Sequence, residues 1–186
     1  MAILATRGVY SVKDMLRQFK AHVWCILEAS NVAIYHASAT HLESLDNVQS
    51  HFLRELGISV ESAFLEHNFA PLKLRRDISA LGLLHKFQLG EAHPDFEKLF
   101  VKRVEQIDFR TRYSARRHTK QIHEVTGNSF YFNHSLFGVV RVYNVLSQGA
   151  VDMLTVSAFQ KVLTEHARHK CRIGDLFWSN IYCRRH

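Results

Sequence analysis

The sequence predicts a mainly α-helical protein, a helical bundle with a long basic connector, and three observations carry that prediction. Apolar residues recur at spacings of three and four over several long stretches, which places them on one face of a helix. Only two prolines and eight glycines interrupt the 186 residues, whereas an all-β chain needs many turns. Hydrophobic residues make up 47% of the chain, enough to bury a core.

The first two helices have recognisable start signals. Residues 12–27 follow Ser11, whose hydroxyl can accept one of the free backbone N–H groups of a first helical turn. Residues 41–56 follow a capping box that begins at Thr40, and Gly57 supplies a stop. We therefore expect two amphipathic helices here.

Prolines and serines begin the helices that follow. Ser59 predicts a short helix to about residue 67, and Pro71 can open a long one over 72–89, because its missing N–H would be unpaired there anyway. The long span is apolar on two faces, with Leu83 and Phe87 on the second. The remaining expected helices are a short one after Pro94, one over 136–146 after Ser135, and one over 157–169.

Between these helices the character of the chain changes. Residues 101–134 hold no clear period, Gly127 and Asn128 indicate a turn, and Phe130 to Phe132 favour a short strand or hairpin near 125–133. The predicted organisation is a helical bundle over 8–100, a basic connector over 101–134, and a C-terminal helical segment with an aromatic and basic tail over 135–186.

Positive charge is concentrated in the second half of the chain. Residues 1–100 hold ten Lys and Arg against eleven Asp and Glu, whereas 101–186 hold fourteen against six. Such an excess favours a polyanionic partner, RNA or DNA contacted through its backbone, although a merely basic soluble surface is the alternative.

Two groups of cations are the candidate contacts. The stronger is the run from residue 110 to 120, with five cations and no acid, and the weaker is a stripe on the first helix that leads to Trp24, a ring able to stack on a base. The candidate nucleic-acid-binding residues are Arg110, Arg112, Arg116, Arg117, Lys120, Lys13, Arg17, Lys20, Arg75 and Lys86.

No catalytic site is evident. The seven aspartates are dispersed, and a two-metal site needs carboxylates that converge on the ions. Phosphate-loop, dinucleotide-binding and nucleophile-elbow motifs are missing, and we expect no cofactor. A zinc site could draw on His166, His169, Cys171, Cys183 and His186, but their order matches no familiar finger, so no metal site is assigned.

The cysteines and hydropathy indicate an intracellular protein, nuclear or cytoplasmic. Three cysteines with no close pair imply no disulfide framework. No run approaches the roughly 18 apolar residues of a membrane span, and the first residues do not resemble a secretory signal, so we expect no membrane partner.

The order of motifs resembles the region downstream of the catalytic palm in reverse transcriptases of non-LTR, jockey-like retrotransposons. The resemblance covers about residues 12–163, with Ala29 at a position where the family usually has tyrosine. Its main blocks are LRQFKAHV at 16–23, LESLDNVQ at 42–49, APLKLRRD at 70–77, SLFGVVRVYN at 135–144 and VSAFQ at 156–160.

This resemblance implies the thumb and post-thumb region of an RNA-directed DNA polymerase, which helps to grip template and primer. The palm with its paired aspartates, a possible partner domain, lies upstream in the family and has no counterpart in this sequence. The expected function is non-catalytic nucleic-acid binding. The alternatives are a helical protein-interaction module, which exposed Leu83 and Phe87 would favour, and an inert retroelement remnant.

Overall fold

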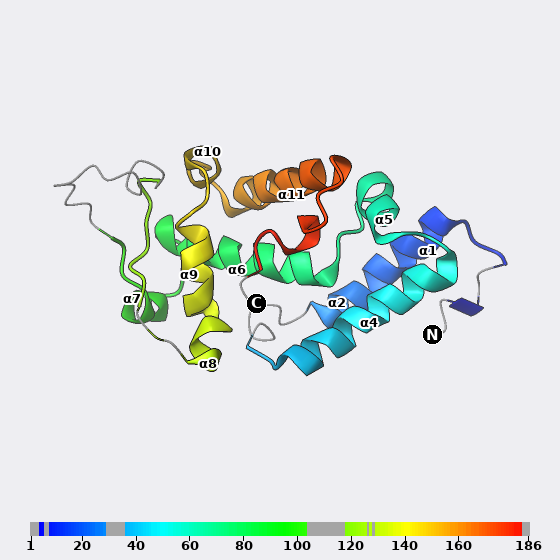
Figure 1. Cartoon of the computed structure of the whole chain (residues 1–186), viewed down its shortest axis with the longest axis horizontal. Coiled ribbons are helices and arrows are strands. Elements are labelled where there is room, and N and C mark those ends of the chain that lie inside the picture. Colours follow the sequence, from blue (N-terminus) through cyan, green and yellow to red (C-terminus); the bar gives the residue numbers. More distant parts are fainter. Residues whose placement is uncertain are drawn as a thin grey trace. The chain divides into compact units, whose positions relative to one another are not determined.

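The computed structural model describes residues 4–5, 8–28, 36–103, 118–125, 127 and 129–183. Within these ranges the protein is mainly helical, and the only β pairing is an isolated antiparallel bridge between Lys102 and Ile122. The predicted mainly α class is therefore confirmed (Figure 1).

The described elements are all helices or short helical turns. In the first half they are α1 (Val12–Phe19), the π-helical η2 (Lys20–Trp24), α2 (Cys25–Leu27), α4 (Ala39–Leu56), α5 (Val60–His67), α6 (Leu72–Gln88) and α7 (Asp95–Leu99). In the second half they are α8 (Phe130–Asn133), α9 (Leu136–Tyr143), α10 (Gln148–Val151), α11 (Val156–Arg172) and the 3-10 turn η4 (Trp178–Asn180).

The chain divides into two compact units. Unit 1 comprises residues 1–76 and 167–181, and unit 2 comprises residues 77–166 and 182–186. The divide falls inside α6 and α11, so each of these helices has residues in both units. The division into 8–100, 101–134 and 135–186 was expected from the distribution of charge along the chain and not from contacts. It stays a prediction.

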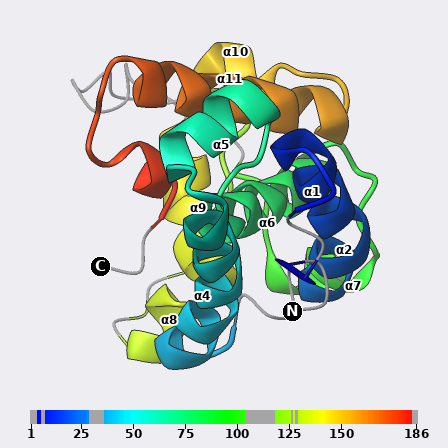
Figure 2. The same cartoon turned by 90° about the vertical axis from the view of Figure 1, so that its right-hand side faces the viewer.

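Unit 1 is built around a cluster of aromatic rings. Phe19 of α1 stacks on Phe52 of α4 with ring centroids 4.3 Å apart, and Phe69 packs edge-on against Phe19 at 5.5 Å. Trp24 stacks on Phe69 at 4.6 Å. Figure 2 looks onto α1, α4 and α5, the helices that supply most of this core. The apolar periods of the first two predicted helices thus meet, as their amphipathicity requires.

Unit 2 buries apolar side chains of α6 together with those of other helices. Leu81, Leu84 and Phe87 of that helix are all buried, as are Val139 of α9 and Phe159 of α11. Exposed Leu83 and Phe87 would have favoured the protein-interaction alternative, but Phe87 lies in the core against Phe100, and Leu83 is half-buried.

Several element boundaries differ from the predictions for local reasons. Helix α4 begins two residues early, because the Ser38 hydroxyl rather than that of Thr40 accepts a first-turn N–H, that of His41. The helix expected to reach residue 146 ends at Tyr143. Its C-cap Asn144 uses its side chain to bond the backbone of Ile122 instead.

The prediction of a strand or hairpin near 125–133 is wrong for those residues of the range that the structure describes. Residues Phe130–Asn133 form a helical turn, α8. Ser129 starts it: its hydroxyl accepts the N–H of Phe132 at 3.2 Å, and its carbonyl accepts the N–H of Asn133 at 3.2 Å. This cap outweighs the weak strand propensity of three aromatic residues. The turn expected at Gly127 and Asn128 lies partly outside the described residues.

Candidate nucleic-acid interface

Two short segments of unit 2 lie on either side of the basic run and pair with each other. The N–H of Arg103 donates to the carbonyl of Gln121 at 2.9 Å, and the N–H of His123 donates to the carbonyl of Val101 at 2.8 Å. The antiparallel bridge between Lys102 and Ile122 lies between these two bonds. The description of the chain stops after Arg103 and resumes at His118, three positions before Gln121, the residue that pairs with Arg103.

Side-chain amides hold this pair of segments on the helices of unit 2. Asn144 accepts the N–H of Ile122 at 2.9 Å and donates to its carbonyl at 2.8 Å, so its amide mimics a neighbouring strand. Gln121 donates to the carbonyl of Asn144 at 2.9 Å. Gln88 at the end of α6 donates to the carbonyl of Gln121 at 3.0 Å. These bonds satisfy buried backbone groups that would otherwise lose hydration.

Two buried histidines of unit 2, His85 and His118, form hydrogen bonds to backbone carbonyl groups. His85 donates through Nε2 to the carbonyl of Met153 at 2.9 Å, so its Nδ1 is left to accept from the Tyr143 hydroxyl at 3.1 Å. His118 donates through Nε2 to the carbonyl of Tyr143 at 2.9 Å. Burial lowers the pKa of both histidines and raises the pKa of Tyr143. All three side chains are therefore held in their neutral forms.

Lys120 is the one lysine or arginine of the predicted basic run that the structure describes. It is half-buried, and its Nζ donates to the carbonyl of Val151 at 2.9 Å. Its charge thus has a structural role in addition to any contact with a ligand. The other four predicted contacts of the run, Arg110, Arg112, Arg116 and Arg117, lie outside the described residues.

Three further cationic or imidazole side chains lie on the paired segments, and the sequence reading missed them. Lys102, Arg103 and His123 are all exposed. Lys102 donates to the carbonyl of Gln88 at 3.2 Å and lies over the ring of Phe87. Their proximity to the basic run in sequence was the available signal. Lys86 is exposed on the last turn of α6.

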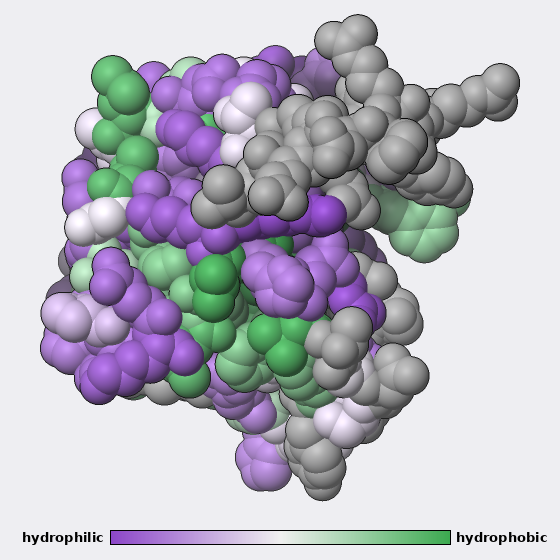
Figure 3. All heavy atoms as spheres, turned by 90° about the vertical axis from the view of Figure 1, so that its left-hand side faces the viewer, coloured by the Kyte–Doolittle hydropathy of each residue, from purple (hydrophilic) through white to green (hydrophobic). Residues whose placement is uncertain are grey.

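The surface near these cations is mixed rather than purely polar. Val101 and Val125, on or next to the paired segments, are exposed, as is Leu99 at the end of α7. Figure 3 views the structure from the side of α7 and shows hydrophilic and hydrophobic side chains next to each other. Such a surface offers both phosphate contacts and apolar contacts to a ligand.

The predicted stripe in unit 1 separates into two kinds of residue. Lys13 and Arg17 are exposed, and Arg17 lies 3.8 Å from Asp14 one turn away. Lys20 is half-buried and lies against Trp24, as does Arg75, which comes from α6 and not from the stripe. The prediction that Trp24 could stack on a base needs correction, because its side chain is only 7% exposed and already stacks on Phe69.

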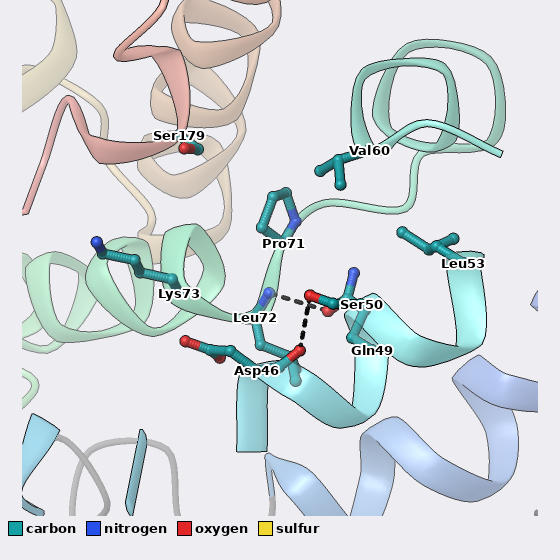
Figure 4. Close-up of a pocket in the computed structure, with 9 residues that line it drawn as sticks. All are labelled: Asp46, Gln49, Ser50, Leu53, Val60, Pro71, Leu72, Lys73 and Ser179. Atoms are coloured by element: carbon teal, nitrogen blue, oxygen red, sulfur yellow. Dashed lines mark hydrogen bonds between the residues drawn. The ribbon is translucent and has the colours of Figure 1, made fainter. Parts of the chain in front are cut away.

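Unit 1 also contains a small pocket of about 160 Å³ (Figure 4). Leu53, Val60 and Pro71 surround a common space, and Gln49 forms part of its wall. Both ends of the Gln49 amide are engaged there, because it donates to the carbonyl of Ala70 and accepts the N–H of Leu72, both at 3.0 Å. We assign no ligand to this largely apolar pocket.

The residues considered for zinc do not assemble in the part of the chain that the structure describes. His166 lies 3.0 Å from the hydroxyl of Tyr182. Cys171 is buried, which raises the pKa of its thiol. His186 lies outside the described residues. Among those that are described, no three His, Cys, Asp or Glu side chains are placed to hold a metal ion.

Comparison of the chain with family models, curated proteins and solved structures finds no match. Among the described helices, none is both long enough and apolar enough to span a lipid bilayer. The class that the structure defines is thus a mainly α-helical protein of two compact units.

Proposed function

We propose that this chain binds RNA or DNA through contacts to the phosphate backbone. The observation that carries the proposal is the run from residue 110 to 120, which holds five cations and no acid. Neutralising phosphates releases condensed counterions, and this gain favours binding to any sequence. The resemblance to the thumb region of non-LTR reverse transcriptases supports the same proposal, because that region grips template and primer.

The paired segments of unit 2 support this proposal from the structural side. The residues that precede and follow the basic run are joined by backbone bonds between Arg103 and Gln121 and between His123 and Val101. Lys102 and Arg103 add exposed positive charge next to these ends. We propose no catalytic role, because the sequence contains no aspartate pair able to hold two metal ions.

A double variant tests the contribution of the basic run. Arg116→Ala combined with Arg117→Ala should weaken binding to RNA and to DNA alike, and should flatten the slope of log affinity against log salt by roughly 1.4 to 1.8. Fluorescence anisotropy with labelled oligonucleotides measures both quantities. Lys120 is left unchanged, because its bond to the carbonyl of Val151 also holds the fold.

The matched control removes the same charge elsewhere in unit 2. Lys98→Ala combined with Lys161→Ala replaces two exposed lysines outside the run. The control should change the salt slope much less than the Arg116 and Arg117 pair does. Equal slopes for the two double variants would remove the basic run from the interface.

Protein docking is a second candidate function, and one observation favours it. Leu176 is 89% exposed and Phe177 is 70% exposed in the turn after α11. The N–H of Phe177 donates to the carboxylate of Asp175 at 2.9 Å, so the turn is held in shape. If docking at this turn includes self-association, Leu176→Ser with Phe177→Ser should abolish that association in sedimentation velocity; a wild-type chain that stays monomeric would count against it.

A further inference from the structure

Two cations of unit 1 gather on one indole ring. The guanidinium carbon of Arg75 lies 4.0 Å from the ring centroid of Trp24, and the ammonium nitrogen of Lys20 lies 5.6 Å from it. Lys20 comes from the π-helical segment η2 and Arg75 from α6, so 55 positions of sequence separate them. Both lie within the range of a cation–π contact, which helps to hold them there.

The charges in this cluster do not balance. Glu28 bonds Arg75 through both carboxylate oxygens, with the Nη2 contact at 2.6 Å. Among the described residues, no carboxylate bonds Lys20. Burial and then repulsion from Arg75 lower the pKa of Lys20. The cluster thus carries two cations and one anion in a partly desolvated position.

Hydrogen-bond donors in the cluster also lack acceptors. Lys20 has three N–H groups, and its one hydrogen bond among the described residues goes to the carbonyl of His67 at 2.8 Å, at the end of α5. That bond gives Lys20 a structural role, but it leaves two of the three N–H groups without an acceptor among the described residues. Arg75 uses Nε and Nη2 on Glu28, and its Nη1 bonds nothing that the structure describes. The buried indole N–H of Trp24 likewise has no partner among the described residues.

We propose that Lys20 and Arg75 form a binding site for a phosphate group. The site has the excess positive charge and the free N–H donors that a phosphate oxygen needs, and an arginine and a lysine together supply directed and adjustable donors. This inference rests on the proposed function, because the phosphate would come from a nucleic-acid backbone. It adds a contact point in unit 1, distinct from the basic run in unit 2.

Inorganic phosphate added to the full-length chain tests the site directly. The indole N–H of Trp24 should give its own NMR signal, which Trp178→Phe distinguishes from that of the other tryptophan. The Trp24 signal should shift in a saturable way with phosphate and not with chloride at equal ionic strength. Lys20→Met should weaken phosphate binding at least about tenfold, because one of the two cations is lost.

The matched control is Lys73→Met, a half-buried lysine on the same helix as Arg75. Residues two positions apart on a helix do not face each other, so Lys73 should not contribute to the site. The control variant should bind phosphate as the wild type does. A Trp24 signal that does not respond to phosphate, or a response that Lys20→Met leaves unchanged, would overturn the proposal.

Glu28→Gln keeps the test valid if Lys20→Met fails to fold. Removing the negative charge of Glu28, which bonds Arg75, should strengthen phosphate binding, on the order of threefold to tenfold. A residue that served only to hold the fold would not increase affinity when it is replaced. Unchanged or weaker phosphate binding in Glu28→Gln would therefore also contradict the site.

A single-stranded oligonucleotide in parallel separates this site from the function it rests on. If both proposals hold, Lys20→Met weakens binding of the oligonucleotide as well as of inorganic phosphate. Phosphate binding without any oligonucleotide binding would keep the site and reject the proposed function. Salt-dependent oligonucleotide binding with a silent Trp24 signal would keep the function and reject the site.

Discussion

Gln49 illustrates how a single side chain can fix a turn in this protein. Pro71 has no N–H, and the backbone groups on either side of it, the carbonyl of Ala70 and the N–H of Leu72, point to the Gln49 amide. Gln49 is 3% exposed, so these two backbone groups have no access to water through it. One glutamine on α4 therefore sets the direction in which α6 begins.

Replacing Gln49 should destabilise the fold substantially. Gln49→Ala leaves two buried backbone groups without partners, and we expect a loss of about 2–4 kcal/mol in the free energy of unfolding. Urea denaturation followed by circular dichroism measures this loss. Ser50→Ala is the control, since Ser50 is exposed and bonds only within its own helix. A loss in Gln49→Ala no larger than in Ser50→Ala would contradict this role.

The two buried histidines of unit 2 should make stability depend on pH. Burial lowers the pKa of His85 and of His118 below the ordinary value of 6.5, despite their bonds to Met153 and Tyr143. Well above pH 6.5 both histidines are neutral in the folded and in the unfolded chain, so the free energy of unfolding is not reduced by their burial. As pH falls below 6.5 the unfolded chain takes up protons that the folded chain resists, so stability is lost at up to about 1.4 kcal/mol per pH unit for each histidine.

Unfolding measurements between pH 8 and pH 5.5 check this dependence. The charged neighbours of the pair are Lys120, Glu91 and Asp152. His118→Asn should reduce the pH dependence, whereas His93→Gln, which replaces an exposed histidine, should not. If the free energy of unfolding depends on pH equally in the wild type and in His118→Asn, the pKa of His118 is the same in the folded and the unfolded chain, which would contradict this prediction.

At the scale of elements, the helices are the part of the fold that the sequence predicts well. Their apolar periods and caps are local, so α4, α5, α6 and α11 follow from them with small errors at the ends. The helix predicted over 12–27 is divided into α1, the π-helical η2 and α2. The helical turn α8 was missed because the Ser129 cap outweighed the strand propensity of Phe130 to Phe132. The pairing of residues 101–103 with 121–123 was missed for another reason: it depends on amides such as Asn144, far away in sequence.

The candidate sites were harder to predict than the helices. The sequence identified Lys20 and Arg75 as cations, but their meeting at Trp24 requires contacts across 55 positions. It also presented Trp24 as a free ring, because periodicity cannot distinguish a buried indole from an exposed one at the edge of an apolar face. The basic run itself was readable directly from composition.

Two glycines in helices of unit 2 should respond oppositely to the same substitution. A Cβ at Gly138 in α9 would lie 2.8 Å from the carbonyl carbon of Asn133, so Gly138→Ala should cost about 1–3 kcal/mol. A Cβ at Gly149 in α10 meets no atom within 4 Å, so Gly149→Ala should stabilise by about 0.5–1 kcal/mol. Thermal unfolding of both variants tests this, and a shift of the same sign in both would contradict the packing of α8 on α9.

At the scale of the whole molecule, charge asymmetry and the missing aspartate pair define what the chain should and should not do. With primer, template, nucleotides and magnesium, the purified chain should extend no primer, because catalysis of that type needs carboxylates that hold two ions. A gel-based extension assay with a buffer control checks this. Extension above the control would mean that the catalytic acids have been misplaced.

The most direct test of the central proposal is the salt dependence of binding by the intact chain. Affinity for single-stranded RNAs of several unrelated sequences should fall linearly with log salt, with a slope of several units, because each phosphate contact contributes about 0.7. The slope should be nearly the same for every sequence, since backbone contacts read no bases. Absence of binding at 50 mM salt, or affinity that does not change with salt, would contradict the account.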